Sequence, residues 1–271
     1  MYRPITDFGK HLINIQQLPE ITSRHLYQTC LLATDMDGTI TKYGKFTSKL
    51  LHTLESLTTA KIPVLIVTGR SAGWVSAITS LMPVVGAIAE NGGLFYPAKD
   101  FQPVTLTHIP DLGYHRQDLA ATFARLQSYF PHLQESSDNQ FRVTDWTFDL
   151  ISLTTDDLNQ ITDLCEQMGW GFTYSTIQCH IKPLGQDKAN GLLKVLRQYF
   201  PVYLPEQVIT VGDSPNDDSL FNQRYFPVSV GVANIREYTN QLKHQPTYIT
   251  TGEEADGFCE LCDYILQNSH R

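Results

Sequence analysis

The feature that most constrains the fold is a recurring unit in which a short, unbroken apolar run is followed by a helical pattern. The run at residues 31–34 precedes a helix expected over residues 47–60, in which four leucines between Leu50 and Leu57 share one face. Further apolar runs occur at residues 64–67, 84–89, 208–211 and 228–232. Such runs are typical of parallel strands that are buried on both faces. The sequence therefore predicts an α/β fold with a Rossmann-like, doubly wound parallel-sheet core.

The stretch at residues 98–183 departs from this alternation. A strand is expected at residues 148–153, a helix over 156–168 that Gly169 ends, and one or two further strands within 172–181. We therefore predict a core formed by residues 1–97 and 184–271, with residues 98–183 inserted as a smaller α/β cap domain. Parallel sheets bind ligands at the carboxyl ends of their strands, so the residues that follow each run are site candidates.

Composition argues against several classes of protein. Of the 271 residues, 42% are apolar, and 20 basic against 28 acidic residues give a net charge of −8. The chain has no basic cluster and no apolar run of about 18 residues, so we expect no nucleic acid partner and no membrane association. The five cysteines are odd in number and mostly far apart, which indicates reduced thiols and a cytoplasmic location. The sequence does not indicate an oligomeric state.

One cysteine pair has the spacing of zinc ligands, namely Cys259 and Cys262. A zinc site needs two further ligands at a matching spacing, and the sequence offers none. We interpret the pair as two cysteines packed on one helix.

The strongest motif is the segment from Asp35 to Thr39, which places two carboxylates, Asp35 and Asp37, two residues apart at the end of an apolar run. Two charges about 4 Å apart repel by roughly 4 kcal/mol at an effective dielectric constant of about 20, so a metal ion or a proton must compensate them. A surface Asp-Gly turn is the simpler alternative. Two other loop types are excluded by Phe46. A calcium-binding loop would need Glu at this position, and a phosphate-binding P-loop would need Ser or Thr there.

A second acidic motif runs from Gly212 to Asp218 and directly follows the apolar run at residues 208–211. On its own, this motif is ordinary turn and helix-capping chemistry. Folding of a parallel sheet can place the two acidic motifs side by side, so that three or four carboxylates converge. Mg²⁺ is the natural partner of such oxygen ligands. The two motifs together therefore predict a magnesium site.

The sequence resembles the haloacid dehalogenase superfamily of phosphohydrolases from about residue 30 onward. The segment 35–39 is similar to the first motif of that family, Thr68-Gly69-Arg70 to the second, Lys188 to the third and the segment 212–217 to the fourth. The large insert lies between the second and third motifs, as in the branch with an α/β cap. The segment Glu90-Asn91-Gly92-Gly93 is most similar to sucrose-phosphate and mannosyl-phosphoglycerate phosphatases, with Cof-type sugar phosphatases close. Ala189 replaces a glycine of many relatives, and we expect a small local change there.

This resemblance implies a mechanism and a cofactor, Mg²⁺. Asp35 would attack phosphorus to form an aspartyl-phosphate, and Asp37 would act as general acid and then general base. The implied metal ligands are Asp35, the backbone carbonyl of Asp37, Asp213 and, in or beside that shell, Asp217. The implied phosphate-binding residues are Thr68, Gly69, Lys188 and Asn216. The expected activity is magnesium-dependent hydrolysis of a sugar-phosphate monoester, with a small-molecule sugar phosphate as the partner.

Specificity is expected to come from the cap and from one strand end of the core. Asn91 and Lys182 are the predicted substrate contacts, Asn91 because it follows a strand and Lys182 because the chain re-enters the core nearby. Other cap residues that can contact a sugar are Arg142, Trp146, Tyr174, Gln178 and His180. Sucrose phosphate, mannosyl-phosphoglycerate, glucosylglycerol phosphate and a general hexose phosphate all stay open as substrates.

Three other functions compete with this interpretation. Residues 69–73 fit the nucleophile elbow of serine hydrolases, with Ser71 as nucleophile and Asp213 and His244 as partners, but this leaves Asp35 and Lys188 without a role. A sugar-phosphate sensor without turnover would be expected to lack one of the two motif carboxylates. A phosphoryl-transferring mutase shares the aspartyl-phosphate step, and it stays an alternative.

Overall fold

The computed structural model describes residues 15–21, 31–99 and 102–268. Within these residues, the main sheet has nine strands in the order β1-β12-β11-β10-β2-β3-β4-β5-β6. Neighbours from β1 to β4 are parallel, whereas β5 and β6 join the edge in antiparallel pairs. The strands are β1 (Gln16–Gln17), β2 (Leu31–Thr34), β3 (Val64–Val67), β4 (Gly86–Ala89), β5 (Leu94–Pro97), β6 (Val104–Thr105), β10 (Val208–Gly212), β11 (Val228–Gly231) and β12 (Tyr248–Ile249). The five predicted runs form β2, β3, β4, β10 and β11, so the predicted α/β fold is confirmed.

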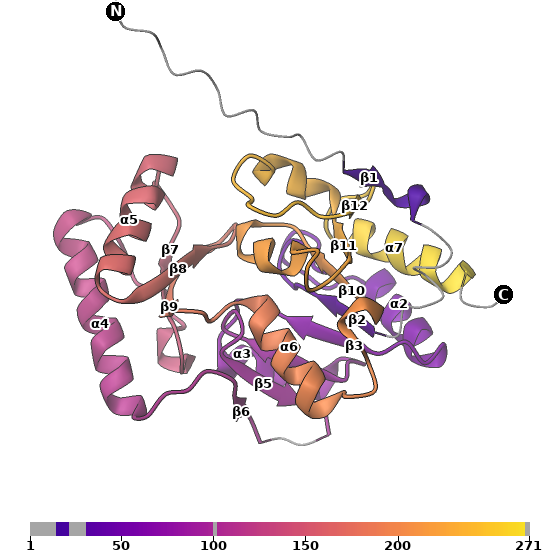
Figure 1. Cartoon of the computed structure of the whole chain (residues 1–271), viewed down its shortest axis with the longest axis horizontal. Helices are drawn as coiled ribbons and strands as arrows, with labels where there is room; N and C mark the ends of the chain where they lie inside the picture. Colours follow the sequence, from indigo (N-terminus) through magenta and orange to yellow (C-terminus); the bar gives the residue numbers. More distant parts are fainter. Residues whose placement is uncertain (1–14, 22–30, 100–101, 269–271) are drawn as a thin grey trace, which may run out of the picture.

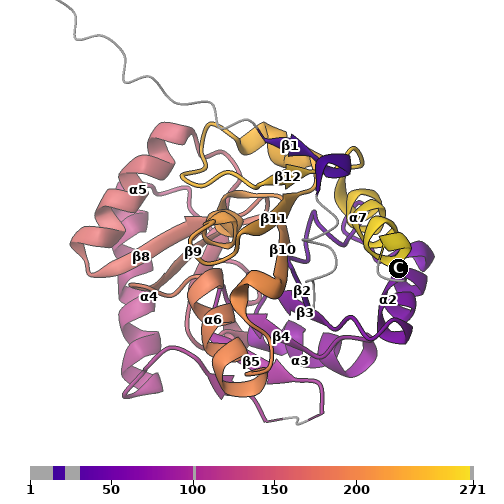
Figure 2. The same cartoon turned by 45° about the vertical axis from the view of Figure 1, so that its right-hand side comes forward.

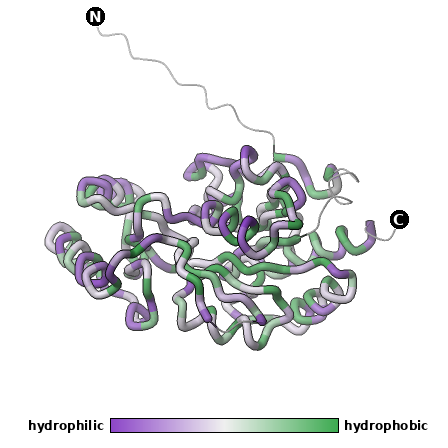
Figure 3. The backbone as a smooth tube through the Cα atoms, turned by 60° about the horizontal axis from the view of Figure 1, so that its bottom comes forward, coloured by the Kyte–Doolittle hydropathy of each residue, from purple (hydrophilic) through white to green (hydrophobic). Residues whose placement is uncertain are grey.

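Helices cover both faces of this sheet, as Figures 1 and 2 show. Helices α2 (Ser48–Thr59), α3 (Ala72–Leu81) and α7 (Glu254–Asn268) pack on one face, and α6 (Lys188–Tyr199) packs on the other. The strands serve both layers because adjacent side chains alternate: Leu32 joins the first cluster, whereas Leu31 joins the second. The tube in Figure 3 is most hydrophobic along these central strands. Three of the four leucines predicted on one face of α2 are buried, but Leu51 is exposed.

Side-chain caps fix where the core helices begin. Thr47 accepts a hydrogen bond from the Leu50 amide at the start of α2, and Asp187 accepts one from the Asn190 amide at the start of α6. The remaining helical turns are the short 3₁₀ helices η1 (Leu18–Glu20), η2 (Asn139–Phe141), η3 (Pro205–Gln207), η4 (Pro215–Phe221) and η5 (Ala233–Tyr238).

A second, smaller sheet lies beside the core in the part of the chain that Figure 1 draws on the left. It consists of the antiparallel strands β7 (Trp146–Asp149), β8 (Trp170–Tyr174) and β9 (Gln178–Pro183) in the order β7-β9-β8. Helices α4 (Leu112–Tyr129) and α5 (Thr155–Gln167) pack against it around a separate apolar cluster. We call β7–β9, α4, α5 and the loops between them the cap. The strand predicted at 148–153 begins earlier and ends at Asp149, and α4 was not predicted.

The boundary predicted between residues 97 and 98 does not coincide with the end of the main sheet. Strand β6 lies within the predicted insert, yet it pairs with β5 of the main sheet. The division into residues 1–97, 98–183 and 184–271 stays a prediction. The main sheet itself includes residues as far along the chain as Thr105.

Cys259 and Cys262 are both buried on α7, as expected for packed helix residues. The Thr53 hydroxyl donates to Cys259 Sγ at 3.4 Å. Cys30 lies outside the described residues. Among the helices described, none is both long and apolar enough to cross a membrane.

Candidate active site

The two acidic motifs meet because β2 and β10 are parallel neighbours in the sheet. Thr34 pairs with Val211, and the Asp35 amide continues the ladder by donating to the Val211 carbonyl at 2.9 Å. Both motifs therefore leave the sheet at the same edge. Carboxylate oxygens of Asp35, Asp213 and Asp217 lie within 4.8 Å of one another, and all three residues are buried.

Glycines make room for this convergence. Gly38 has a φ of +78°, and a Cβ at this position would overlap the Asp213 carboxylate. At the end of β10, a Cβ on Gly212 would overlap the side chain of Asp217. Substitution of either glycine would therefore displace an acidic side chain of the cluster.

Lys188 is the one buried ammonium group within this cluster in the described part of the chain. It is the first residue of α6, and its Nζ donates to Asp35 Oδ1 and to Asp217 Oδ1, the latter at 2.6 Å. Burial opposes its charge, but the carboxylates of Asp217 and Asp35 outweigh burial and raise the pKa of Lys188. A cation in a first helical turn opposes the helix dipole, so the ion pairs hold it there.

The acidic cluster carries more negative charge than Lys188 neutralises. Burial raises the pKa of Asp35 to about 7, although Lys188 acts in the opposite direction. Burial, followed by the charges of Asp35 and Asp217, also holds the pKa of Asp213 well above its usual range. The cluster therefore favours a further cation, and a site of buried carboxylate oxygens suits a hard divalent ion.

The orientation of Asp213 depends on residues that the sequence analysis did not single out. The Thr39 hydroxyl donates to Asp213 Oδ1 at 2.8 Å, and Asn234 Nδ2 donates to Asp213 Oδ2 at 2.9 Å. Asn234 Nδ2 also donates to the Gly38 carbonyl, so it joins the two motifs. Asn234 follows β11, and the strand-end criterion that selected Asp35 and Asp213 would also have selected it.

Asp37 does not join the carboxylate cluster. Its carboxylate pairs with Arg70, which donates from Nε at 2.8 Å and from a terminal nitrogen at 2.6 Å. The Arg70 guanidinium also lies 4.9 Å from the ring centroid of Trp74. Arg70 was assigned no function of its own from the sequence, because no local pattern shows that the loops after β2 and β3 place it opposite Asp37.

Three of the predicted phosphate-binding residues, Thr68, Gly69 and Asn216, line one small space, and Lys188 contacts Asp35, which lines it as well. Thr68 is buried at the end of β3, and its hydroxyl accepts a hydrogen bond from the Arg70 amide at 3.1 Å. Asn216 Nδ2 donates to Asn91 Oδ1 at 3.1 Å, which joins η4 to the loop after β4. Asn91 Nδ2 is buried and has no hydrogen-bond partner among the described residues. Asn91 Nδ2 lies 3.2 Å from the place that a Cβ of Gly69 would take. A free donor therefore borders the loop of residues 68–70, which we call the phosphate loop after its predicted role.

This space is a cavity of about 20 Å³ between core and cap. Its core lining is Asp35, Asp37, Thr68, Gly69, Arg70 and Asn216, and its cap lining is Ser175, Ile177, Gln178 and His180. A cavity of this size holds about one water molecule. The structure is therefore a closed form, and the cap must move before a larger ligand can enter.

Glu90 connects the cap to the core. This buried residue follows β4 with a φ of +54°, and its carboxylate accepts hydrogen bonds from the amides of Ala72, Val143 and Thr144. The Thr144 hydroxyl adds another at 2.8 Å. Burial, followed by the charge of Asp145, raises the pKa of Glu90 to about 7. One side chain thus joins the start of α3 to the segment that leads into β7.

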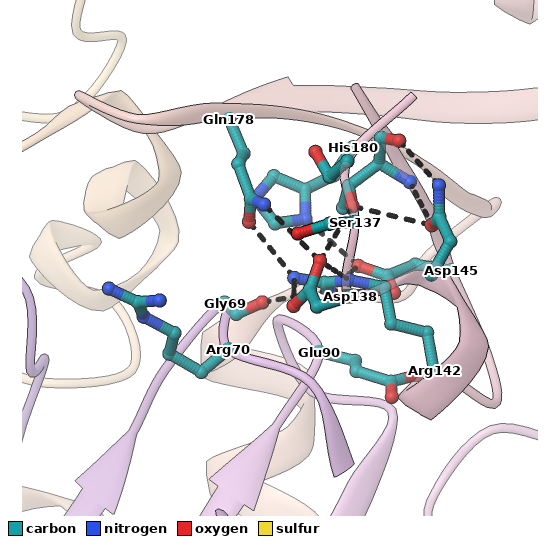
Figure 4. A network of polar contacts seen from close by, with 12 residues as sticks. Gly69, Arg70, Glu90, Ser137, Asp138, Arg142, Asp145, Gln178 and His180 are labelled. Carbon is teal, nitrogen blue, oxygen red and sulfur yellow. Dashed lines mark hydrogen bonds and ion pairs between the residues drawn. The ribbon is translucent and has the colours of Figure 1, made fainter. Parts of the chain in front are cut away.

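Arg142 forms the second connection, shown in Figure 4. Its guanidinium is completely buried and donates to the Gly69 carbonyl of the phosphate loop at 3.0 Å. It also donates to both oxygens of Asp145, to Asp138 and to Gln178. Asp145 in turn contacts His180 Nδ1 at 2.9 Å. Figure 4 shows the Arg70 side chain pointing away from this network.

The other cap residues named from the sequence lie elsewhere. Lys182 does not line the cavity, and its ammonium donates to the Gln186 carbonyl, so its role as a substrate contact stays a prediction. The Trp146 ring stacks on Arg116 at 4.6 Å, and the Tyr174 hydroxyl donates to Gln241 at 2.8 Å.

The serine hydrolase alternative lacks its geometry. Ser71 Oγ is buried and has no hydrogen-bond partner among the described residues, so no histidine activates it. His244, the proposed base, pairs with Asp218 at 2.8 Å.

Comparisons with known proteins identify a family and several similar structures. Residues 28–264 match the family described as sucrose-6F-phosphate phosphohydrolase. A phosphoglycolate phosphatase of Methanothrix thermoacetophila is 25% identical over 246 residues, which cover 86% of this chain and 96% of that protein. The solved sucrose-phosphatase from Synechocystis, in complex with sucrose and phosphate, has a TM-score of 0.63 at 19% identity, covering 88% of this chain and 98% of that one. The C-terminal domain of the C. albicans trehalose-6-phosphate phosphatase has a TM-score of 0.67 at 15% identity, and the match covers 90% of this chain and 95% of that one.

Proposed function

The chain belongs to the sucrose-6F-phosphate phosphohydrolase family of haloacid dehalogenase-like phosphatases, and from this premise we propose that it hydrolyses a sugar-phosphate monoester with Mg²⁺. It is a phosphoric monoester hydrolase of the sucrose-phosphatase and Cof-like branch, so the recognised resemblance is confirmed. The observation that carries the proposal is the buried convergence of Asp35, Asp213 and Asp217 around Lys188.

The proposed reaction has two steps. Asp35 attacks phosphorus, the bond from phosphorus to the sugar oxygen breaks, and Asp37 gives that oxygen a proton. Water then attacks the phosphorus of the aspartyl-phosphate, Asp37 takes a proton from the water, and Asp35 is released with inorganic phosphate. Asp37 must turn from Arg70 toward the bridging oxygen for this role, because both its oxygens contact that guanidinium in the closed form.

The residues present suit Mg²⁺. Asp35, Asp213 and the backbone carbonyl of Asp37 would hold the ion, which supplies positive charge to the phosphoryl oxygens when it is bound. Asp217 supports this site from beside it. One of its oxygens accepts from Lys188, and the other accepts from the amides of Asp213 and Ser214.

The phosphoryl group would be held by donors that line the cavity or contact its lining residues. The Thr68 hydroxyl, the Gly69 amide, Lys188 and the Asn216 amide group fill this role, and the unpartnered Nδ2 of Asn91 adds a further donor. Positioning and charge compensation by fixed groups supply most of the rate enhancement in such transfers.

The substrate we propose is a sucrose-phosphate-type or related glycosyl phosphate, with a broad Cof-type hexose phosphatase as the alternative. The matched family supports the first. Relatives named phosphoglycolate phosphatase make a small carboxylate-bearing ester a further test compound. The sequence-based expectation of a cytoplasmic location belongs with this proposal.

The test is phosphate release from sucrose 6-phosphate, trehalose 6-phosphate, glucose 6-phosphate and phosphoglycolate, with Mg²⁺ or with a chelator. Asp35→Asn is expected to lower kcat at least about a thousandfold. Asp218→Asn is the matched control, because Asp218 belongs to the second acidic motif but pairs with His244 and does not line the cavity. Activity that persists in the chelator, or in Asp35→Asn, would refute the mechanism.

A further inference from the structure

His180 of β9 lies directly over the phosphate loop of the core. The residue is only 1% exposed and lines the cavity together with Asp35. A Cβ on Gly69 would come within 3.1 Å of His180 Cε1 and 3.2 Å of its Nε2, so the ring packs on the bare face of that glycine. The ring of His180 thus packs against the phosphate loop from the cap side.

The hydrogen bonding of the ring leaves one nitrogen free. Asp145 is buried, and although burial opposes its charge, Arg142 and His180 lower its pKa, so it is an ionised acceptor. His180 Nδ1 therefore donates to Asp145, and Nε2 carries a lone pair. Burial lowers the pKa of His180, which keeps the ring neutral; the charges facing it are Asp145, Arg142 and Lys188. Nε2 makes no hydrogen bond with any described residue.

The remaining cap groups at the cavity are already occupied. Ile177 is apolar, and the Ser175 hydroxyl accepts from the amides of Ile177 and Gln178. The Gln178 side chain accepts from Arg142 and donates to Asp138. Among the described cap residues that line the cavity, His180 Nε2 is therefore the side-chain hydrogen-bond acceptor without a partner.

The cations near the cavity are equally engaged. Arg70 of the core makes a two-pronged pair with Asp37 in the closed form, which the proposed turn of Asp37 would release, and Arg142 of the cap is saturated by cap carboxylates and the Gly69 carbonyl. Lys188 lies between two carboxylates. A carboxylate on the leaving group would thus find no free cation on the described part of the cap. It would also lie near the negative charge of Asp145, which is hydrogen-bonded to His180.

We propose that His180, held in place by Asp145 and Arg142, accepts a hydrogen bond from a hydroxyl of the leaving group and so selects uncharged, hydroxylated alcohols over carboxylate-bearing ones. This inference rests on the proposed phosphatase function and narrows its substrate class. His180 is the residue that contacts the substrate, and Asp145 and Arg142 are positioning residues.

The first arm of the test compares kcat/KM of the wild type with Mg²⁺ for sucrose 6-phosphate, phosphoglycolate and p-nitrophenyl phosphate. The sugar phosphate is expected to exceed phosphoglycolate at least tenfold. A preference for phosphoglycolate would overturn the inference while leaving the phosphatase function intact. Absence of turnover on every ester would refute the proposed function itself.

The second arm uses variants of the network. His180→Phe is expected to lower kcat/KM for sucrose 6-phosphate about tenfold, mainly through KM, and to change that for p-nitrophenyl phosphate less than about twofold. His180→Gln, whose amide oxygen can accept the same bond, is expected to recover part of the loss. Asp145→Asn should give the same substrate-dependent pattern. His115→Gln is the matched control, because this cap histidine contacts the Thr144 carbonyl instead of the cavity. Equal losses on both esters in His180→Gln and Asp145→Asn would overturn the inference.

Discussion

Replacing Arg142 by methionine tests whether the cap network contributes to stability. The guanidinium has 0% exposure and binds acceptors on the phosphate loop and on the cap. Methionine keeps much of the apolar stem but leaves Asp145, also 0% exposed, without its cation. Breaking a buried ion pair in this way costs about 3–5 kcal/mol. With a urea m-value of about 3 kcal/mol per molar, the midpoint of unfolding should fall by about 1–1.7 M.

The assay is equilibrium urea unfolding followed by circular dichroism, with Arg125→Met as the control. Arg125 lies on α4 and is exposed, so its replacement should change stability by no more than about 0.5 kcal/mol. Combining Arg142→Met with Asp145→Asn should recover part of the loss, since the second change removes the stranded charge. A midpoint for Arg142→Met equal to or above that of the wild type would refute this reasoning.

Three further variants probe the junction, the cap and the metal site. Glu90→Gln replaces an oxygen acceptor by a donor facing the amides of Val143 and Thr144, so unfolding free energy should fall by about 1–3 kcal/mol and proteolysis of that segment should quicken; unchanged cleavage would contradict this. Burial lowers the pKa of His180, so its contribution to stability is present above about pH 6.5 and lost as the pH falls. His180→Gln should therefore shrink the difference in unfolding free energy between pH 7.5 and 5.5 by about 1 kcal/mol, whereas an identical pH slope would argue against a neutral ring. Gly38→Ala puts a side chain at a φ of +78° and should lower the free energy of unfolding by at least about 1–2 kcal/mol, measured by thermal unfolding. It should also lower Mg²⁺-dependent activity. A wild-type melting temperature would rule out the proposed strain.

Sequence patterns were sufficient where a side chain acts through its own strand or helix. Asp35 and Asp213 follow apolar runs, and the parallel order of β2 and β10 makes their meeting a direct consequence of the fold. The buried strands have almost no alternative assignment, because their residues are apolar without interruption. Helix α4 was missed because much of its surface is polar and exposed, so its apolar periodicity is weak.

Contacts between separate loops, and between core and cap, could not be predicted from such patterns. The pairing of Arg70 with Asp37 depends on how two loops approach each other, and that of Arg142 with Gly69 depends on how the cap is seated. Lys182 was selected for its place near the re-entry point, but the chain turns its ammonium toward Gln186 instead. Sequence separation carries no information on these side-chain directions, so specificity was the least predictable part of the site.

The insertion of the cap between β6 and α6 also has a consequence for synthesis of the protein on the ribosome. Thr39 and Asp213 are hydrogen-bonded partners that lie 174 residues apart in the chain. At about 5–20 residues per second, roughly 9–35 s separate their appearance during translation. Throughout that interval the apolar strand β2 has no β10 beside it, and its open edge is available to other nascent chains. The same arrangement that brings the catalytic carboxylates together thus leaves every amino-terminal fragment that ends before Asp213 without the complete carboxylate cluster and with an open strand edge.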